Sequence, residues 1–495
     1  MSNPGMVYLV GAGPGDAGLL SIKARQLLAE ANVVVYDRLV GDDVMALIPS
    51  KTERINVGKN VGNHAVPQCR INEILLEQAR MGKMVVRLKG GDCFLFGRGG
   101  EELELLVKNA VPFCVVPGVP SPIAASAYAG IPITHRDYCS SVHFITGHKK
   151  ADGALNLDYE ALVRLNGTMI FMMSVANAGE IADGLMQSGM DASMPCAIVE
   201  NGTLPVQRKF IGTVGTLGLM IVEHAVVSPA LIIVGKVCLL SDRYDWFSAL
   251  PLKGRRILVT RPKPESDRLG MKLRALGADV TAASAIQTQP ISFTMPSLQN
   301  YTWLVLTSAA GVSSFLDHLL AIGRDARSLS GIKIACVGTA TAEALRQRGL
   351  VADFIPDTYS GKALAEALLS RGLVTANDRL LLARANIASA ELTDALANGN
   401  IAYTELPVYE TILAEKDSLH AAAYELVTFT SASCVEGFIH MTAPNTDFSV
   451  IRAVCIGEQT ATAAKAHGMQ VIQSKSATID AMVDRILKWV QEEQL

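Results

Sequence analysis

Apolar runs alternate with amphipathic helical stretches along the first half of the chain. The run at 6–10 leads into a glycine-rich turn at 11–16, and the run at 85–89 leads into a second one that starts with Gly90 and Gly91. Strands that alternate with helices predict an α/β domain. Glycines at the ends of two strands let a ligand approach the backbone closely, so we expect a ligand crevice there.

The second half of the chain repeats its own pattern. The apolar run that ends at Arg261 is echoed by one ending at Arg384, and the run that ends at Thr307 is echoed at the same spacing by one ending at Thr430. Each copy is an apolar run that ends in small or hydroxyl residues, followed by an amphipathic helix. Such a repeat predicts two similar α/β domains, and a cleft between them would be the natural ligand site.

A boundary between the two halves is predicted after the last apolar run of the first half, at 229–240. A short tether follows, and a new strand–turn–helix pattern starts at Lys253. We therefore expect two units, at 6–247 and 253–495. The tether is not a long Pro/Gly/Ser linker, so the units are expected to lie close together.

Composition excludes several classes of protein. The 495 residues are 49% apolar, enough for sizeable cores, and the net charge of −3 argues against broad nucleic-acid binding. Nine cysteines without a C-x-x-C pair predict no metal site and favour a reducing cytoplasm. We expect neither a secretory leader nor a membrane span. An acidic substrate would have to be held by local basic groups.

The first glycine turn differs from a dinucleotide-binding turn. Asp16 replaces the third glycine of that motif and would repel phosphate, while Pro14 removes a backbone N–H. The chain instead carries, in order, YDRLV, VGK, GGD with FGRGGEE, VVPGVPSPIAASAYAGIPITHR, TGH and ENGT. Over roughly 6–247 these motifs closely resemble the uroporphyrinogen-III C-methyltransferases, which use S-adenosylmethionine.

The resemblance implies roles for individual residues of the first half. Asp37 would be the proton acceptor and Lys59 the proton donor, although Lys59 could equally hold a carboxylate arm of the substrate. The methyl donor would be bound by Pro14, Gly90, Gly91, Asp92, Leu95, Pro120, Ser121, Met173 and Gly202. The substrate carboxylates would be held by basic residues of the motif loops, chiefly Arg38, Arg98, Arg136 and His148, with Arg87 and Lys89 as further candidates.

Each role has a structural alternative. Asp37 could cap a helix or pair with Arg38, the glycines could serve turn geometry alone, and Met173 could be ordinary core packing. The basic residues could be solvated surface charges. Two departures from the family pattern are Cys93, in place of a common proline, and Ser174, which adds a side chain beside the donor site.

The second half resembles uroporphyrinogen-III synthase through VTRP, TSA, VGTATA, VYET, FTSAS and IGEQTA, taken in order. The resemblance implies two α/β lobes between which the chain crosses twice, no cofactor, and a role for Tyr409 in assisting loss of the substrate hydroxyl. Tyr409 lies close to Pro407 and could instead be only a hinge packing residue. Hydroxyl residues at strand ends would bind carboxylates, or would only cap helices: Thr307, Ser308, Thr430, Ser431 and Thr460. The stretch 384–392 departs from the family, where glycines and a second arginine are common.

The sequence thus predicts an α/β protein with an N-terminal two-lobed tetrapyrrole methyltransferase fold and a C-terminal bilobed synthase. It would convert hydroxymethylbilane into uroporphyrinogen III and methylate that product twice, at C-2 and C-7, to precorrin-2. The expected assembly is a homodimer formed through the methyltransferase half. Alternatives are a methyltransferase for a later corrin precursor, and a methyltransferase joined to a synthase-like domain that only binds tetrapyrroles.

Overall fold

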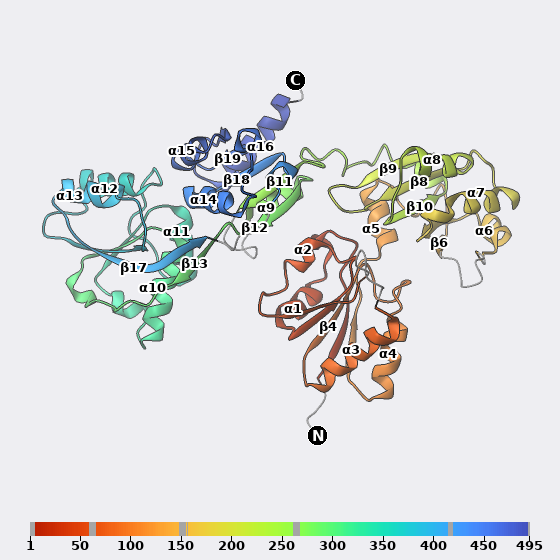
Figure 1. Ribbon diagram of the computed structural model, residues 1–495, viewed down its shortest axis with the longest axis horizontal. Helices are drawn as coiled ribbons and strands as arrows, with labels where there is room; N and C mark the ends of the chain where they lie inside the picture. The colour runs from red at the N-terminus through yellow and green to blue at the C-terminus, as the bar shows by residue number, and fades with distance from the viewer. Residues whose placement is uncertain are drawn as a thin grey trace. The chain divides into compact units, whose positions relative to one another are not determined.

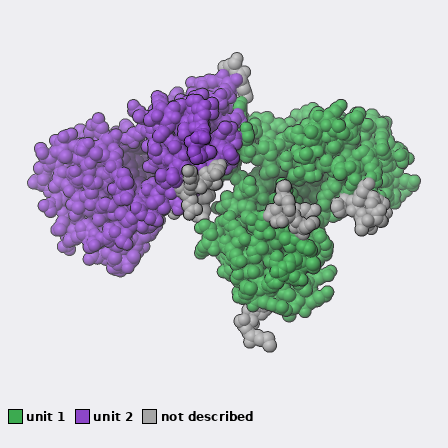
Figure 2. Space-filling view, viewed as in Figure 1, with its two compact units in different colours: residues 1–256, 271–280 green, residues 257–270, 281–495 purple. Residues whose placement is uncertain are grey.

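The computed structural model describes residues 5–58, 66–147, 155, 157–260, 268–413 and 419–493. The chain divides into two compact units, drawn in separate colours in Figure 2. Unit 1 comprises residues 1–256 and 271–280, and unit 2 comprises residues 257–270 and 281–495. Within the described ranges, no helix is both long and apolar enough to cross a bilayer.

Unit 1 begins with a parallel five-stranded sheet, as the alternating pattern predicts. Its order is β3 (Glu53–Asn56), β2 (Val33–Tyr36), β4 (Val85–Lys89), β1 (Val7–Gly11) and β5 (Phe113–Val116). Because all five strands run the same way, the turns that follow them gather at one edge of the sheet.

Helices cover both faces of this first sheet (Figure 1). Helices α3 (Gln68–Arg80) and α4 (Gly99–Lys108) pack on the face that carries Val33 and Val35. Helices α1 (Ile22–Glu30) and α2 (Asp42–Met45) pack on the face that carries Val34. Successive residues of a strand point to opposite faces, so a continuous valine run supplies both cores.

A second, mixed sheet completes unit 1. Its order is β6 (Val142–Thr146), β7 (Thr168–Met172), β10 (Ala230–Val234), β8 (Pro195–Glu200) and β9 (Arg208–Thr213), and only the β6–β7 pair is parallel. Helix α5 (Ser121–Tyr128) leads from the first sheet and packs on one face through Ala125. The other face is covered by α7 (Ala178–Gln187) and α8 (Leu217–Glu223), with α6 (Tyr159–Leu165) beside them.

Unit 2 contains two five-stranded sheets. One has the order β12 (Asp279–Ala283), β11 (Arg256–Thr260), β18 (Leu426–Phe429), β19 (Arg452–Cys455) and β20 (Gln470–Gln473). The other has the order β13 (Ile286–Pro290), β17 (Ala402–Leu413), β16 (Arg379–Ala385), β14 (Trp303–Leu306) and β15 (Lys333–Cys336). The unit boundary passes through α9 (Arg268–Ala275), whose residues from Met271 onward belong to unit 1. The other helices that accompany these sheets are α10 (Ala309–Ala321), α11 (Thr339–Gln347), α12 (Gly361–Ser370), α13 (Glu391–Asn398), α14 (Ala432–Met441), α15 (Glu458–Ala466) and α16 (Ile479–Glu493).

The sequence repeat is distributed over both sheets of unit 2. The echoed strands β11 and β16 lie in different sheets, and so do β14 and β18; β11 pairs with β18, and β14 pairs with β16. Each sheet therefore combines strands from both copies of the repeat. This exchange confirms that the lobes are similar and that they do not follow the repeat boundary.

Candidate functional site

The two glycine-rich turns of unit 1 are joined directly. The Gly91 N–H donates to the Gly13 carbonyl at 2.7 Å, and the Gly13 N–H donates to the Gly91 carbonyl at 3.1 Å. The turns meet because β1 and β4 are parallel neighbours. A Cβ at Gly11 would lie 2.4 Å from the Gly118 amide nitrogen, so only glycine permits this approach.

The loop after β4 is held in place by the carboxylate of Asp92. Its Oδ1 accepts hydrogen bonds from the amides of Phe94 (2.8 Å) and Leu95 (3.1 Å), and its Oδ2 accepts one from Gly118 (3.1 Å). Asp92 thus ties the turn after β4 to the turn after β5, where Pro120 precedes α5.

The space beside Gly91 is open to a ligand. Gly91 has a φ of +70°, and a Cβ added there would meet only the Ser121 amide nitrogen, at 3.7 Å. Pro14 and Ser121 are half-buried around this space. A backbone cradle of this kind fits a compact polar ligand such as the amino-acid part of S-adenosylmethionine, and among the described residues no cluster could hold a metal ion.

The second sheet contributes two of the predicted donor-binding residues. Met173 follows β7, has a φ of 55° and is 51% exposed, so its core-packing alternative is wrong. Gly202 follows β8, and a Cβ there would lie 2.2 Å from the Cβ of Ala125 on α5. The adjacent Ser174 is buried, and its hydroxyl donates to the Met172 carbonyl at 2.7 Å.

Asp37 lies directly after β2 with its side chain 27% exposed. Arg87 Nη2 is 3.2 Å from Asp37 Oδ2, and the Gly90 N–H donates to Oδ1 at 3.4 Å. The residue that caps α2 is Gly41, and the ion-pair partner of Asp37 is Arg87, so neither structural alternative for Asp37 is observed.

Arg87 and Lys89 do not face a substrate, contrary to our expectation. Arg87 is 3% and Lys89 5% exposed, and both bind Oε1 of the fully buried Glu102, at 3.1 Å and 2.8 Å. Buried charges must be paired, and Glu102 supplies the counter-charge. The sequence analysis missed Glu102, although it is one of the paired acids that open α4.

The remaining predicted basic residues fall into two groups. Arg38, Arg98 and Arg136 are exposed, and Arg98 forms a surface ion pair with Glu101 at 2.7 Å. Lys59 and His148 lie outside the described residues.

A hydrogen-bond network centred on Asp16 joins the glycine-rich loop at 11–16 to the second sheet. The Tyr128 hydroxyl donates to Asp16 Oδ2 at 2.5 Å, and the Asp16 N–H donates to Thr203 Oγ1 at 3.3 Å. Gln207 closes the network: it accepts from the Thr203 N–H at 2.8 Å and donates to the Tyr128 carbonyl at 3.1 Å. Burial, followed by the Asp16 carboxylate, raises the pKa of Tyr128, so its hydroxyl remains a donor. The sequence showed Asp16 only as a departure from another motif.

In unit 2, Ser308 and Tyr409 are brought together. The Ser308 hydroxyl donates to the Tyr409 hydroxyl at 3.0 Å, while its oxygen accepts the Gly311 N–H at 3.0 Å as the N-cap of α10. Tyr409 lies on β17 and is 9% exposed. Ser431 caps α14 in the same way. The helix-capping alternative is therefore observed for both serines.

The three predicted threonines of unit 2 differ in exposure. Thr307 and Thr430 are half-buried at strand ends, whereas Thr460 is 4% exposed, which leaves little of its side chain to meet a ligand. Arg384 is also buried. It donates to the Ser389 carbonyl at 2.5 Å and lies 3.3 Å from Glu405.

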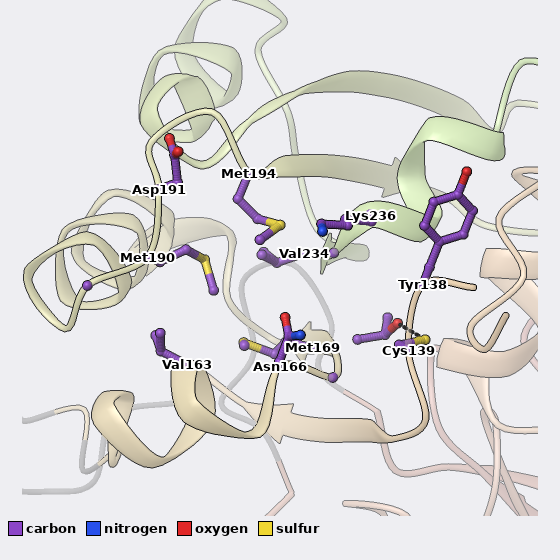
Figure 3. Close-up of a pocket in the computed structure, with 14 residues that line it drawn as sticks. Tyr138, Cys139, Val163, Asn166, Met169, Met190, Asp191, Met194, Val234 and Lys236 are labelled. Carbon is purple, nitrogen blue, oxygen red and sulfur yellow. Dashed lines mark hydrogen bonds between the residues drawn. The ribbon is translucent and has the colours of Figure 1, made fainter. Parts of the chain in front are cut away.

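A separate pocket of about 200 Å³ lies in the second sheet of unit 1 (Figure 3). It is lined by Thr168 at the start of β7, by Asn166, and by the side chains of Met190 and Met194. Met173 follows the opposite end of β7, so this pocket is distinct from the predicted donor site, and none of the predicted site residues lines it.

Comparisons with known proteins identify both halves. Residues 6–218 match the family of tetrapyrrole (corrin/porphyrin) methylases, and residues 267–484 match uroporphyrinogen-III synthase HemD. The chain therefore combines an N-terminal domain of the tetrapyrrole-methylase type with a C-terminal domain of the uroporphyrinogen-III-synthase type, a combination that belongs to tetrapyrrole biosynthesis.

Individual relatives agree with this division. The chain is 46% identical over 496 residues to the porphyrin biosynthesis protein HemD of Ruminiclostridium josui, with 98% of each chain covered. It belongs to the family of that protein. It is 53% identical over 249 residues to siroheme synthase 2 of Yersinia enterocolitica, a match that spans 50% of this chain and 52% of that one.

Two solved structures align with parts of the chain. The uroporphyrin-III C-methyltransferase of Thermus thermophilus, complexed with S-adenosylhomocysteine, is 41% identical, with a TM-score of 0.41 and coverage of 47% of this chain and 93% of that one. A mutant uroporphyrinogen III synthase of Thermus thermophilus is 17% identical, with a TM-score of 0.36 and coverage of 48% of this chain and 100% of that one.

Proposed function

We propose that unit 1 methylates uroporphyrinogen III twice, at C-2 and C-7, with S-adenosylmethionine as the methyl donor, and so forms precorrin-2. The observation that carries this proposal is the joining of the two glycine turns at the strand edge, with the Asp37 carboxylate hydrogen-bonded to the Gly90 amide at that edge. The match of residues 6–218 to the tetrapyrrole methylases supports the same assignment.

The residues of unit 1 would mainly align the methyl donor with the pyrrole substrate and remove a proton after methyl transfer. S-adenosylmethionine, when bound, supplies an electrophilic methyl group that the electron-rich pyrrole carbon can attack without an activated side chain. Asp37 would accept the proton released from the methylated carbon, since its carboxylate lies at the open edge and is partly exposed. Arg87 and the Gly90 N–H hold that carboxylate in one orientation.

The donor would lie in the cradle around Gly91. Pro14, Gly90, Leu95, Pro120, Ser121, Met173 and Gly202 would line it, with Asp92 holding its loops in shape. The exposed Arg38, Arg98 and Arg136 are available for the carboxylate arms of the substrate, together with Lys59 and His148 by family resemblance.

We propose that unit 2 closes hydroxymethylbilane to uroporphyrinogen III with inversion of the last ring. Tyr409 would assist departure of the hydroxyl, and Ser308 is placed to orient the Tyr409 hydroxyl. The hydroxyl residues Thr307, Thr430 and Ser431, and less so the buried Thr460, are candidate contacts for the substrate carboxylates. We further propose that methyl transfer takes place in residues 6–247 and ring closure in residues 253–495, and that the protein dimerises through its methyltransferase half.

The methyltransferase assignment is tested with purified protein, uroporphyrinogen III and S-adenosylmethionine. Mass spectrometry should show two added methyl groups, and NMR of the product should place them at C-2 and C-7. A protein that binds the donor but methylates only a later corrin precursor would contradict the substrate assignment.

A further inference from the structure

The segment that follows the last strand of unit 1 makes an unexpected set of contacts. Residues 243–254 lie beyond both family matches, which cover 6–218 and 267–484. A mere linker would expose its side chains, yet Phe247 is 6% and Leu252 0% exposed.

One set of contacts runs from this segment to Asp16. The rings of Trp246 and Phe247 pack on the Tyr128 ring at centroid distances of 4.9 Å and 4.8 Å. The indole N–H of Trp246 donates to the Ala127 carbonyl at 3.1 Å, which fixes the end of α5. Tyr128, held in this way, donates its hydroxyl to Asp16 in the glycine-rich donor loop.

A second set runs from Lys253 to the same loop. The Lys253 ammonium lies 3.9 Å from the centroid of the Phe247 ring and donates to the Leu204 carbonyl at 3.2 Å. Leu204 packs on Gly15, because a Cβ at Gly15 would lie 2.6 Å from Leu204 Cδ2. Burial lowers the pKa of Lys253 to about 8, as expected for an ammonium taken out of water.

Backbone strain lies where the two sets of contacts converge. Thr203 has a φ of 73°, which is rare for a β-branched residue and persists only where the surroundings hold it. Its neighbours provide that hold: the Asp16 N–H binds its hydroxyl oxygen, and Gln207 binds its N–H. Thr203 directly follows Gly202, one of the proposed donor-binding residues.

We propose that residues 246–253 are positioning residues of the methyl-donor site, acting through Tyr128 on Asp16 and through Leu204 on Gly15. The segment that leads to unit 2 would then hold the glycine-rich loop at 11–16 in the shape that binds the methyl donor. This inference rests on the proposed use of S-adenosylmethionine by unit 1. It predicts that breaking the contacts of residues 246–253 lowers the affinity for the methyl donor and leaves tetrapyrrole binding unchanged.

The test measures binding of S-adenosylhomocysteine to the full chain by calorimetry. Tyr128→Phe removes only the hydroxyl that reaches Asp16, and we expect a loss of affinity of about tenfold, as for a hydrogen bond to a charged group. Lys253→Gln should lose several-fold, whereas Lys253→Arg, which keeps the cation over Phe247, should retain affinity. Tyr244→Phe is the matched control, since the Tyr244 hydroxyl lies in the same segment but outside these contacts.

Steady-state kinetics separate positioning from general damage. In Tyr128→Phe and Lys253→Gln the KM for S-adenosylmethionine should rise while the KM for uroporphyrinogen III stays unchanged. Affinities within twofold of wild type in both variants would overturn the inference. If Tyr128→Phe fails to fold, the Lys253 pair decides, because equal affinity of its Gln and Arg variants would overturn it. Failure of the wild-type chain to bind S-adenosylhomocysteine would instead refute the proposed function.

Discussion

Replacing Glu102 by glutamine should destabilise unit 1 far more than the same change at its neighbour Glu101. Glu102 is fully buried, and its Oε1 is the acceptor for both Arg87 and Lys89. When Glu102 loses its charge, Lys89 stays buried without a counter-ion, and Asp37 remains as the ion-pair partner of Arg87. Removing one partner of a buried ion pair costs about 3 to 5 kcal/mol. Glu101 and Arg98 form an exposed pair, so Glu101→Gln should leave the stability of unit 1 almost unchanged.

The assay is urea unfolding of the full chain, with the transitions of the two units analysed separately. With an m-value of about 3 kcal/mol/M, Glu102→Gln should lower the midpoint of the unit 1 transition by about 1 to 2 M. The unit 2 transition is an internal control and should not move. Equal midpoints for Glu102→Gln and Glu101→Gln would refute the reasoning, because they would mean that the buried charges are not held by Glu102.

Three further predictions concern the two sites. Asp37→Asn keeps the size and hydrogen bonding of the side chain but removes its basicity, so methylation should fall by about 100-fold or more while calorimetry still detects donor binding; near-normal turnover would remove Asp37 from the mechanism. Gly202→Ala would bring a Cβ within 2.2 Å of Ala125 Cβ and should weaken S-adenosylhomocysteine binding by about tenfold or more. The control is Gly179→Ala on α7, where the new Cβ meets nothing within 4 Å, and this variant should bind normally. Tyr409→Phe should slow enzymatic loss of water from hydroxymethylbilane by about 10- to 1,000-fold, and should shift the product from isomer III, whose last ring is inverted, towards isomer I. Ser308→Ala should give a smaller shift in the same direction. Unchanged isomer III formation in Tyr409→Phe would assign Tyr409 to packing.

The sequence was sufficient to predict the features of the fold that are set locally. The apolar runs at 6–10 and 85–89 predicted strands that end in glycine turns, and the structure shows that these strands are parallel neighbours whose turns meet. The repeat in the second half predicted two similar lobes. It could not predict that β11 pairs with β18, since strand pairing depends on contacts between distant residues.

The sequence was less informative about buried polar groups. We expected Arg87 and Lys89 to be free to bind the substrate, because the sequence pattern of a strand does not reveal which charged side chains are buried and paired with a carboxylate. Asp16 was seen as a mismatch to another motif, since its partners Tyr128 and Thr203 lie 112 and 187 residues away along the chain. Met173 was predicted at the site, but neither its positive φ nor its exposure can be inferred from the residue type.

The most direct test of the account is incubation of the pure protein with hydroxymethylbilane, with and without S-adenosylmethionine. Without the donor, we expect uroporphyrinogen III and no isomer I. With the donor, we expect precorrin-2. Isomer I in the absence of donor, formed at the spontaneous rate, would show that unit 2 only binds tetrapyrroles. Isomer III that gains no methyl group in the presence of the donor would contradict the assignment of unit 1.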